Sequence, residues 1–192
     1  MTGRDARARA FEGAFACVGR FGLAKTTIDD VAREAGVSRA TIYRWFPGGR
    51  EQLVRETVAW EMNRFFARLA EEVGGAPDLA SLVEDGLVFA RRAVVEHEVL
   101  QKVLRTEPDR LLPLLTVESR RVVASIGAFL LPSLEREGDA GRLAPGVDPH
   151  AAADFVARMV LSLITSPGRW DLGDREQVRH LVREELLAGI VR

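Results

Sequence analysis

Along almost the whole chain, apolar residues recur at spacings of three and four, and no stretch of four to eight residues alternates apolar with polar side chains. Spacings of three and four place side chains on one face of an α-helix, whereas a half-buried strand requires strict alternation. Glycine and proline interrupt the pattern, as in the segment 74–77, and divide it into separate helices. The sequence therefore predicts an all-α fold of about nine helices with no sheet.

Capping residues and breaks set the expected bounds of these helices. Thr27, Ser38, Asp78, Asp148 and Asp174 each precede a helical segment and carry a side-chain oxygen that can accept a hydrogen bond from the helix start. The helices are expected at about residues 4–20, 28–35, 39–46, 50–73, 79–97, 98–105, 113–136, 149–166 and 175–190.

The composition excludes several classes of protein. With 192 residues, 47% of them hydrophobic, the chain can form one or two domains with a sizeable core. The longest nearly uncharged apolar run, residues 122–131, is about half of the roughly 20 residues that a membrane span needs. No apolar segment follows the basic N-terminus, so we expect no secretory signal and a cytoplasmic location. The one cysteine, Cys17, allows neither an internal disulfide nor a cysteine-based metal cluster, and no cofactor is expected.

The charge is distributed unevenly along the chain. Residues 1–50 carry nine basic and five acidic side chains, a net charge of +4, while the remainder carries −5. A basic end on an acidic body indicates that one end contacts a polyanion. Charge differences of this size also arise by chance, so a local motif is needed to identify that end.

The segment 26–46 has the layout of a helix-turn-helix motif. Thr27 opens a short helix, and Asp30 three residues later completes a capping-box pattern with aspartate in place of glutamate. Gly36 follows that helix where a left-handed residue is needed, and Ser38 caps the next helix. Two short helices joined by a tight turn that contains glycine form the motif whose second helix enters the major groove of DNA.

The two faces of this motif differ in chemistry. Six aliphatic or small residues are expected to point inward and let the helices pack closely: Ile28, Val31, Ala32, Ala35, Val37 and Ile42. The outward face of the second helix offers Arg39, Thr41, Tyr43 and Arg44. Arginine can donate two hydrogen bonds to a guanine edge, and threonine can contact a thymine methyl group. On the pattern alone, a pair of packed helices with an ordinary polar outer face stays an alternative.

With Phe15 and Phe21-Gly22 before it, this segment resembles the DNA-binding domain of the tetracycline-repressor (TetR) family of bacterial regulators. The matching residues are Thr26-Thr27, Ile28, Ala32, Ala35-Gly36-Val37-Ser38, Thr41-Ile42-Tyr43 and Phe46. The resemblance covers about the first quarter of the chain, and the rest agrees with the family in length and helix count. It implies an all-α homodimer whose N-terminal domains lie in successive major grooves of a double-stranded DNA operator, and a C-terminal body that binds a small molecule and releases the DNA.

The resemblance also implies a division of the chain and a set of DNA contacts. A DNA-binding helix-turn-helix domain is expected at residues 1–49, and a helical ligand-binding and dimerisation domain at residues 50–192. Arg39, Ala40 and Thr41 would read bases, their neighbours would contact phosphate or sugar, and Thr27 would bind phosphate at the amino end of its helix. The full expected set is Thr27, Ser38, Arg39, Ala40, Thr41, Tyr43, Arg44, Trp45 and Arg50.

The chain departs from the family pattern just after Phe46. The family usually has lysine three residues after this phenylalanine and leucine three residues further on. Here Gly49 takes the lysine position, Arg50 follows it and Leu53 comes one residue late. We expect the added glycine to lengthen the turn and Arg50 to supply the cation.

The C-terminal body offers candidates for a largely apolar effector pocket with a few polar anchors. They are Trp60, Met62, Phe66, Phe89, His97, Arg105, Arg120, Phe129 and Arg158. Each aromatic side chain can equally fill the core, and His97 can end a helix. Arg158 lies in a strongly apolar helix, so it is expected to extend to solvent, to pair with Glu107 or Asp154, or to bind an anionic ligand.

Two apolar stripes near the C-terminus predict a helical hairpin. Such a hairpin can close the chain's own core, or it can pack against its copy in a second subunit as a four-helix interface. The sequence leaves both alternatives open. The interface would involve Phe155, Met159, Leu163, Val178, Leu181 and Val182.

The sequence gives no sign of catalysis or membrane binding. His97, His150 and His180 lack metal-type spacing, no glycine-rich phosphate loop is present, and no helix sets a Lys/Arg-rich face against a clean apolar one. We therefore expect a non-enzymatic transcriptional regulator, a repressor that binds a palindromic operator as a homodimer and is released by a small-molecule effector. The alternative is a constitutive helix-turn-helix dimer or a protein-interaction module with no effector.

Overall fold

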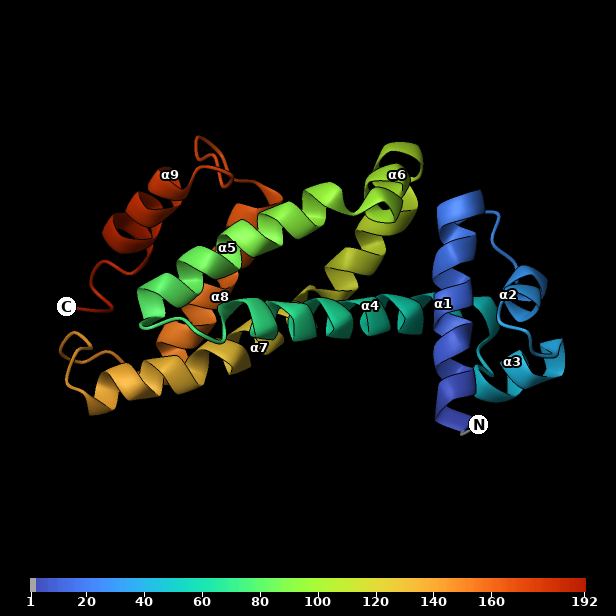
Figure 1. Ribbon diagram of the computed structural model, residues 1–192, viewed down its shortest axis with the longest axis horizontal. Coiled ribbons are helices and arrows are strands. Elements are labelled where there is room, and N and C mark those ends of the chain that lie inside the picture. Colours follow the sequence, from blue (N-terminus) through green and yellow to red (C-terminus); the bar gives the residue numbers. More distant parts are fainter. Residues whose placement is uncertain (1–2) are drawn as a thin grey trace. The chain divides into compact units, whose positions relative to one another are not determined.

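The computed structural model describes the backbone of residues 3–192 and the side chains of residues 7–111, 113 and 119–192. Over this range the chain forms ten helical elements and no strand, which confirms the predicted all-α fold (Figure 1). Isolated bridges join Val191 to Leu143 and to Ala188. The elements are α1 (Gly3–Phe21), α2 (Ile28–Glu34), α3 (Arg39–Trp45), α4 (Gly49–Val73), α5 (Leu79–Glu96), α6 (Glu98–Thr106), α7 (Pro108–Asp139), α8 (Pro149–Thr165), α9 (Arg175–His180) and the π-helical turn η1 (Leu181–Leu186).

The expected caps open the helices that follow them. The side chains of Thr27, Ser38, Asp78, Asp148 and Asp174 each accept a hydrogen bond from a backbone N–H two or three residues ahead. A helix leaves its first N–H groups without partners inside the helix, so these oxygens stabilise each start. The predicted starts of α2, α3, α5, α8 and α9 are confirmed.

The two largest differences from the expected helix boundaries lie at the start of α7 and at the C-terminus. α7 begins at Pro108, where a residue without an N–H costs nothing. Pro113, the expected start, lies inside α7 and costs the helix one hydrogen bond. At the C-terminus the helix ends at Leu186 instead of continuing to about Ile190. Gly189 has a φ of +79°, a left-handed conformation that interrupts a helix.

The chain divides into two compact units. The first unit consists of the chain up to Ala67 together with Glu96–Val117, and the second consists of Arg68–Val95 and Glu118–Arg192. The compact units therefore do not divide at the expected boundary between residues 49 and 50. The first unit includes most of α4, all of α6 and the start of α7 besides the N-terminal helices.

An apolar cluster holds α1, α2, α3 and the start of α4 together in the first unit. Cys17, Val31, Ile42, Phe46 and Leu53 belong to this cluster, and each is at most 2% exposed. Burial raises the pKa of the Cys17 thiol, so this cysteine stays protonated and acts as a core residue.

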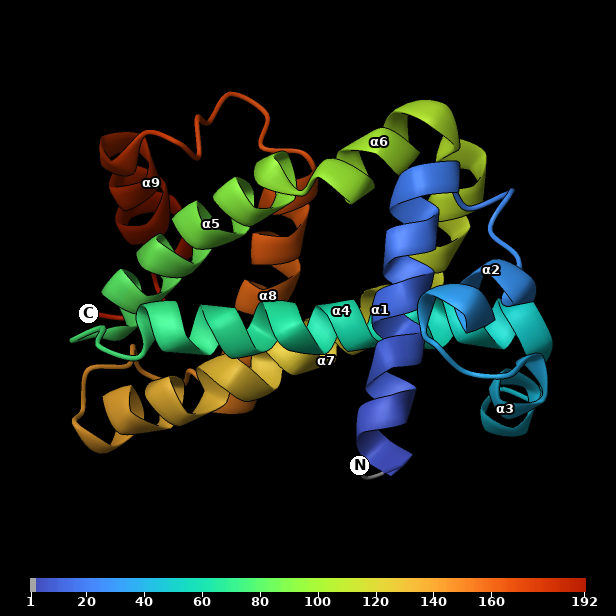
Figure 2. The same ribbon diagram turned by 45° about the vertical axis from the view of Figure 1, so that its right-hand side comes forward.

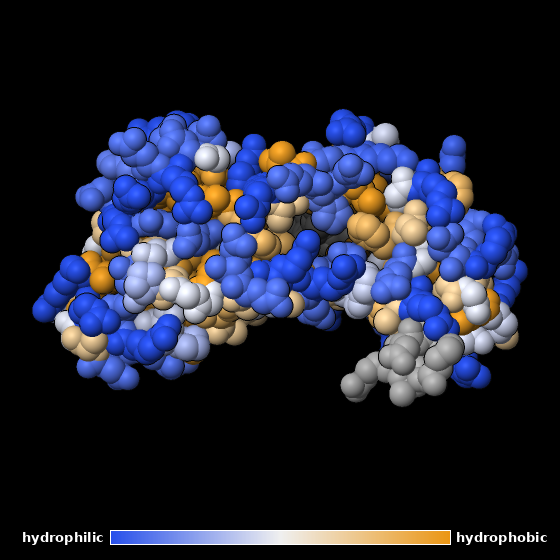
Figure 3. All heavy atoms as spheres, in the orientation of Figure 1, coloured by the Kyte–Doolittle hydropathy of each residue, from blue (hydrophilic) through white to orange (hydrophobic). Residues whose placement is uncertain are grey.

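The second unit has a core of its own. Leu79 and Leu87 of α5, Leu134 of α7, Val156 of α8 and Val182 of η1 are each at most 1% exposed. Hydrophilic side chains dominate the surface over α9 on the face shown in Figure 3. None of the helices in the described part of the chain combines the length and the apolar character needed to span a bilayer.

Candidate nucleic-acid interface

A reciprocal cap fixes the start of α2. Thr27 Oγ1 accepts a hydrogen bond from Asp30 N at 3.2 Å, while the Asp30 carboxylate accepts from Thr27 N at 3.2 Å and from the Thr27 hydroxyl at 2.6 Å. The bond from the Thr27 hydroxyl is the main reason that the pKa of Asp30 lies below its ordinary value. The predicted capping box is confirmed, and it occupies the hydroxyl that we expected to contact phosphate.

The turn between α2 and α3 follows the predicted pattern. Gly36 has a φ of +66°, and Val37 N donates to the carbonyl oxygen of Ala32 at 3.0 Å. Ser38 Oγ accepts from Thr41 N at 3.1 Å and lies 2.9 Å from Thr41 Oγ1. The turn and the second cap therefore set the direction in which α3 leaves α2.

Small residues let α1 lie close against α2 (Figure 2). A Cβ atom added at Gly13 would come within 3.3–3.4 Å of backbone atoms of Ala35 and Val31, which is a tight contact. Ala32 and Ala35 are each 5% exposed, as expected for residues at a close helix crossing. Since Ile42 of α3 is fully buried on this side, the opposite face of α3 points to solvent.

Most of the α3 residues that we expect to contact bases or phosphates lie on that outward face. Its exposed residues are Arg39, Ala40, Tyr43 and Arg44. Thr41 and Trp45 are half-buried, and Trp45 packs partly against the core cluster. The face thus presents two guanidinium groups and a phenol, which can donate hydrogen bonds to base edges and phosphates.

Arg39 is held by neighbours on both helices of the motif. Its Nη1 donates to Asp29 Oδ2 on α2 at 3.2 Å, and its guanidinium carbon lies 5.5 Å from the centre of the Tyr43 ring. A hydrogen bond with Tyr43 and then the charge of Asp29 raise the pKa of Arg39. The guanidinium is charged, and it has a partner on each of the two helices although its side chain is 61% exposed.

Arg50 of α4, which we expected to bind a DNA phosphate, instead bonds through its side chain to the loop between α1 and α2. Its Nε donates to the carbonyl oxygen of Thr26 at 2.7 Å, and its Nη2 donates to the carbonyl oxygen of Leu23. Gly49 before it has a φ of +65°, a conformation that favours glycine and accommodates the departure from the family pattern. A contact between Arg50 and DNA would require these internal bonds to break.

Two residues of the α6 region also bind the backbone at the end of α1, and sequence reasoning missed them. Lys102 Nζ donates to the carbonyl oxygens of Gly19 at 2.6 Å and Arg20 at 3.1 Å. Glu107 Oε2 accepts a hydrogen bond from Ala24 N at 2.7 Å. Lys102 thus binds carbonyls that the helix end leaves unpaired, and its charge is favourable at the negative end of the helix dipole.

Apolar contacts accompany these polar ones. Leu23 of the loop and Val54 of α4 form a buried cluster with Val103 of α6 and Leu111 of α7. No local signal could have revealed this arrangement, because about 80 residues separate Lys102 from the carbonyls that it binds. We use the term loop grip for the set Arg50, Lys102 and Glu107.

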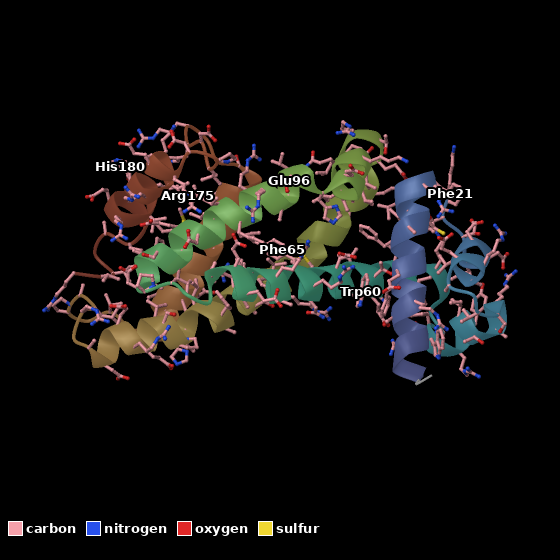
Figure 4. All side chains as sticks on the ribbon, in the orientation of Figure 1. Phe21, Trp60, Phe65, Glu96, Arg175 and His180 are labelled. Atoms are coloured by element: carbon pink, nitrogen blue, oxygen red, sulfur yellow. The ribbon has the colours of Figure 1, made fainter. Side chains whose placement is uncertain are left out.

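The nine expected effector residues are divided between the two units. Trp60, Met62, Phe66, His97 and Arg105 belong to the first unit, and Phe89, Arg120, Phe129 and Arg158 to the second. Trp60 stacks on Phe11 with 5.8 Å between ring centres and lies on α4 next to α1 (Figure 4). It lines an open groove of about 630 Å³ together with Arg7, Ala8, Phe11, Glu56, Ala59 and Asn63.

Several of the other candidates have structural roles. His97 Nδ1 accepts a hydrogen bond from Leu100 N at 3.0 Å, so this histidine caps α6. Phe89 is 8% exposed and belongs to the core of the second unit. Arg158 pairs with Asp154, its Nε 2.7 Å from Oδ2, which is one of the three expected arrangements. Met62, Phe66 and Phe129 are half-buried, and Arg105 and Arg120 are exposed.

The residues expected at a dimer interface differ in accessibility. Leu163, Val178, Leu181 and Val182 are each at most 9% exposed within the single chain, so their part of the hairpin closes the chain's own core. Phe155 and Met159 of α8 are 48% and 38% exposed. These two stay available to a second copy, while the four buried side chains do not. Among the described residues no cluster of histidine, cysteine, aspartate and glutamate could hold a metal ion.

Comparison with known proteins places the motif in a family. Residues 11–57 match the model of the bacterial regulatory proteins of the tetR family. An uncharacterized HTH-type transcriptional regulator of Mycobacterium bovis (Mb2274c) is 30% identical over 148 residues, which are 73% of this chain and 75% of that protein. Another from Mycobacterium tuberculosis (Rv0196) is 36% identical over 63 residues, 33% of this chain; the match spans about a third of that relative's length.

Solved structures share the fold along nearly the whole chain. The TetR-family repressor AlkX from Dietzia sp. has a TM-score of 0.66 at 21% identity, with 97% of each chain covered. The complex of SmeT with triclosan has a TM-score of 0.59 at 22% identity, covering 98% of this chain and 92% of that one. SmeT is a repressor from Stenotrophomonas maltophilia. The chain belongs to the TetR family of bacterial regulatory proteins, which are non-enzymatic transcriptional regulators that bind DNA through a helix-turn-helix.

Proposed function

We propose that this protein is a repressor that binds an inverted-repeat operator as a homodimer and releases it when a small molecule binds. The observation that carries the proposal is the outward face of α3, where Arg39, Tyr43 and Arg44 are exposed on a helix held by a cap and by the buried Ile42. An α-helix fits the major groove of B-form DNA, and a guanidinium can donate two hydrogen bonds to guanine there.

In this proposal the residues of α3 make two kinds of contact with DNA. Arg39, Ala40 and Thr41 at the amino end of the helix read bases, while Tyr43 and Arg44 bind the phosphate backbone. Contacts to bases discriminate between sequences, whereas contacts to phosphates supply affinity that falls as salt rises. The N-terminus of α2 adds backbone N–H groups beside a phosphate, a geometry that helix N-termini favour.

A second copy is needed because one short helix reads few base pairs. Two recognition helices of a dimer must meet half-sites one helical turn, about 34–36 Å, apart. The exposed apolar pair Phe155 and Met159 on α8 supports a dimer contact at this helix. Replacement of both residues by glutamate should give a monomer in sedimentation experiments, whereas Val95→Glu, at an apolar residue 50% exposed on α5, should stay dimeric.

Release by a small molecule is supported by the SmeT–triclosan complex, in which a protein of the same fold binds a largely apolar compound. Such a ligand lowers operator affinity only as far as it binds the DNA-incompetent conformation better than the competent one. Thermal-shift screening with small apolar and anionic compounds should identify ligands, since a ligand that binds the folded state raises its melting temperature.

Selection of bound sequences from random duplex DNA tests the DNA-binding part of the proposal. We expect enrichment of one sequence with two inverted halves, whose centres lie about 10 base pairs or a multiple of this apart. An enriched sequence without symmetry would contradict the homodimer. A protein that enriches no sequence would be a protein-interaction module, the alternative that the sequence left open.

A further inference from the structure

Asp29 and Asp30 are adjacent carboxylates in the first turn of α2, and they make different contacts. Asp30 completes the capping box with Thr27. Asp29 instead reaches the first residue of α3, where its Oδ2 accepts a hydrogen bond from Arg39 Nη1 at 3.2 Å. The two side chains of this pair are 55% and 61% exposed, so the contact lies on the surface rather than in the core.

The pair constrains the residue at the start of the expected recognition helix. Arg39 has Asp29 on one side and the ring of Tyr43, one turn further along α3, on the other. Both neighbours lie on helices whose starts are capped, so the backbone positions from which they reach Arg39 are fixed. A long side chain that is already oriented loses less rotamer freedom when it forms directed hydrogen bonds.

We propose that Asp29 is a positioning residue that raises the sequence discrimination of this protein by acting through Arg39; this inference rests on the proposed function. On operator DNA a guanine edge meets the guanidinium where Asp29 and Tyr43 hold it. On other sequences the guanidinium gains most by turning to a phosphate, which requires it to leave Asp29.

The test compares Asp29→Asn with a control that changes the charge equally. Glu34→Gln removes one negative charge from the other end of α2, where Glu34 pairs with Arg20 at 2.9 Å. Affinities for the selected operator and for a random duplex of the same length are measured at one salt concentration. We expect Asp29→Asn to lower the ratio of operator to random affinity about two- to five-fold, the range for an exposed ion pair, and Glu34→Gln to leave it unchanged.

A double-mutant cycle separates action through Arg39 from a general effect of charge. In an Arg39→Ala background, Asp29→Asn should leave the affinity ratio unchanged, because the side chain that it positions is gone. Asp29→Glu keeps the charge but displaces the carboxylate, and it should give an intermediate ratio. If thermal unfolding shows that Asp29→Asn is poorly folded, Asp29→Glu is used as the test variant in its place.

The outcomes that overturn the inference differ from those that overturn the proposed function. Asp29 acts only as a surface charge if Asp29→Asn lowers the ratio of operator to random affinity no more than Glu34→Gln does. The same holds if Asp29→Asn lowers this ratio as much in the Arg39→Ala background as in the wild type. If selection enriches no DNA sequence, the proposed function fails and this inference fails with it.

Discussion

Within each unit, polar contacts join segments that are distant in sequence, and the kind of contact differs between the two units. In the first unit the loop grip joins distant segments through the backbone: Arg50 and Lys102 donate to carbonyl oxygens, and Glu107 accepts from an amide. In the second unit, α9 and η1 are joined to α5 by exposed ion pairs, Arg175 with Asp85 and Arg183 with Glu84. The apolar core beneath them holds these helices together.

This difference indicates which charged residues contribute most to the stability of the fold. An exposed ion pair gains little, because water solvates both partners well and salt screens their attraction. A cation bonded to main-chain carbonyls of buried loop residues satisfies acceptors that water reaches poorly, and its loss leaves them poorly solvated. The same residue type, arginine, should therefore matter very differently in the two units.

The largest expected effect is that of Arg50→Ala. Loss of the bonds to the Thr26 and Leu23 carbonyls should lower the free energy of unfolding by about 2–3 kcal/mol. Arg50→Lys should recover only part of this, since one ammonium does not reproduce the planar fork. Urea denaturation measures both. The control is Arg55→Ala, an exposed arginine of the same helix; equal losses in the two alanine variants would show that the bonds of Arg50 to the loop carbonyls add no stability.

Arg39→Ala should change DNA binding strongly and stability hardly at all. Removal of a base-reading guanidinium should weaken operator binding about 10- to 30-fold and relax the base preference at one position. Arg158→Ala in the second unit is the matched control, because Arg158 is also exposed and also paired with an aspartate, Asp154. Equal losses on operator and random DNA would reassign Arg39 to the phosphate backbone.

Thr27→Ala should have an intermediate effect, a loss of about 1 kcal/mol in the free energy of unfolding. The variant lacks the hydroxyl that lowers the pKa of Asp30. A carboxyl with a lowered pKa stabilises the fold above its ordinary pKa of about 4 and loses this contribution as the pH falls through the lowered value. The difference between wild type and variant should therefore narrow in acid. A constant difference from pH 7 to pH 2 would show that Asp30 contributes nothing through this bond.

Arg183→Ala should have the smallest effect, at most about 0.5 kcal/mol at low salt. Its Nε lies 2.7 Å from Glu84, but the side chain is 43% exposed. The effect should disappear at about 1 M salt, where charges are screened within roughly 3 Å. A loss as large as that of Arg50→Ala, or one that salt does not reduce, would mean that ion pairs hold the second unit as well.

Local signals predicted the two caps and the turn of the helix-turn-helix motif. Thr27 with Asp30, Gly36 and Ser38 each act through atoms within a few residues, so their spacing determined both caps and the turn between them. The choice between Pro108 and Pro113 as the start of α7 could not be made locally, since proline is favoured at any first helical position.

Features that depend on distant segments were not accessible to sequence reasoning. The pattern of apolar residues showed that Val178, Leu181 and Val182 lie on one face, but only the packed chain shows that this face is covered from within. The carbonyls that Arg50 binds lie 24 and 27 residues before it, and nothing in the sequence distinguishes them from a phosphate as partners.

The loop grip has a consequence for anyone who would transplant the amino-terminal helices into another protein. Lys102 and Glu107 follow the segment that they secure by about 80 residues, so a graft cut at the end of the motif would leave both behind. A chimera that retains the native angle of α1 has to carry the stretch 96–117 along with the first 67 residues. The part of the protein to transplant therefore consists of two segments that are separated in the sequence.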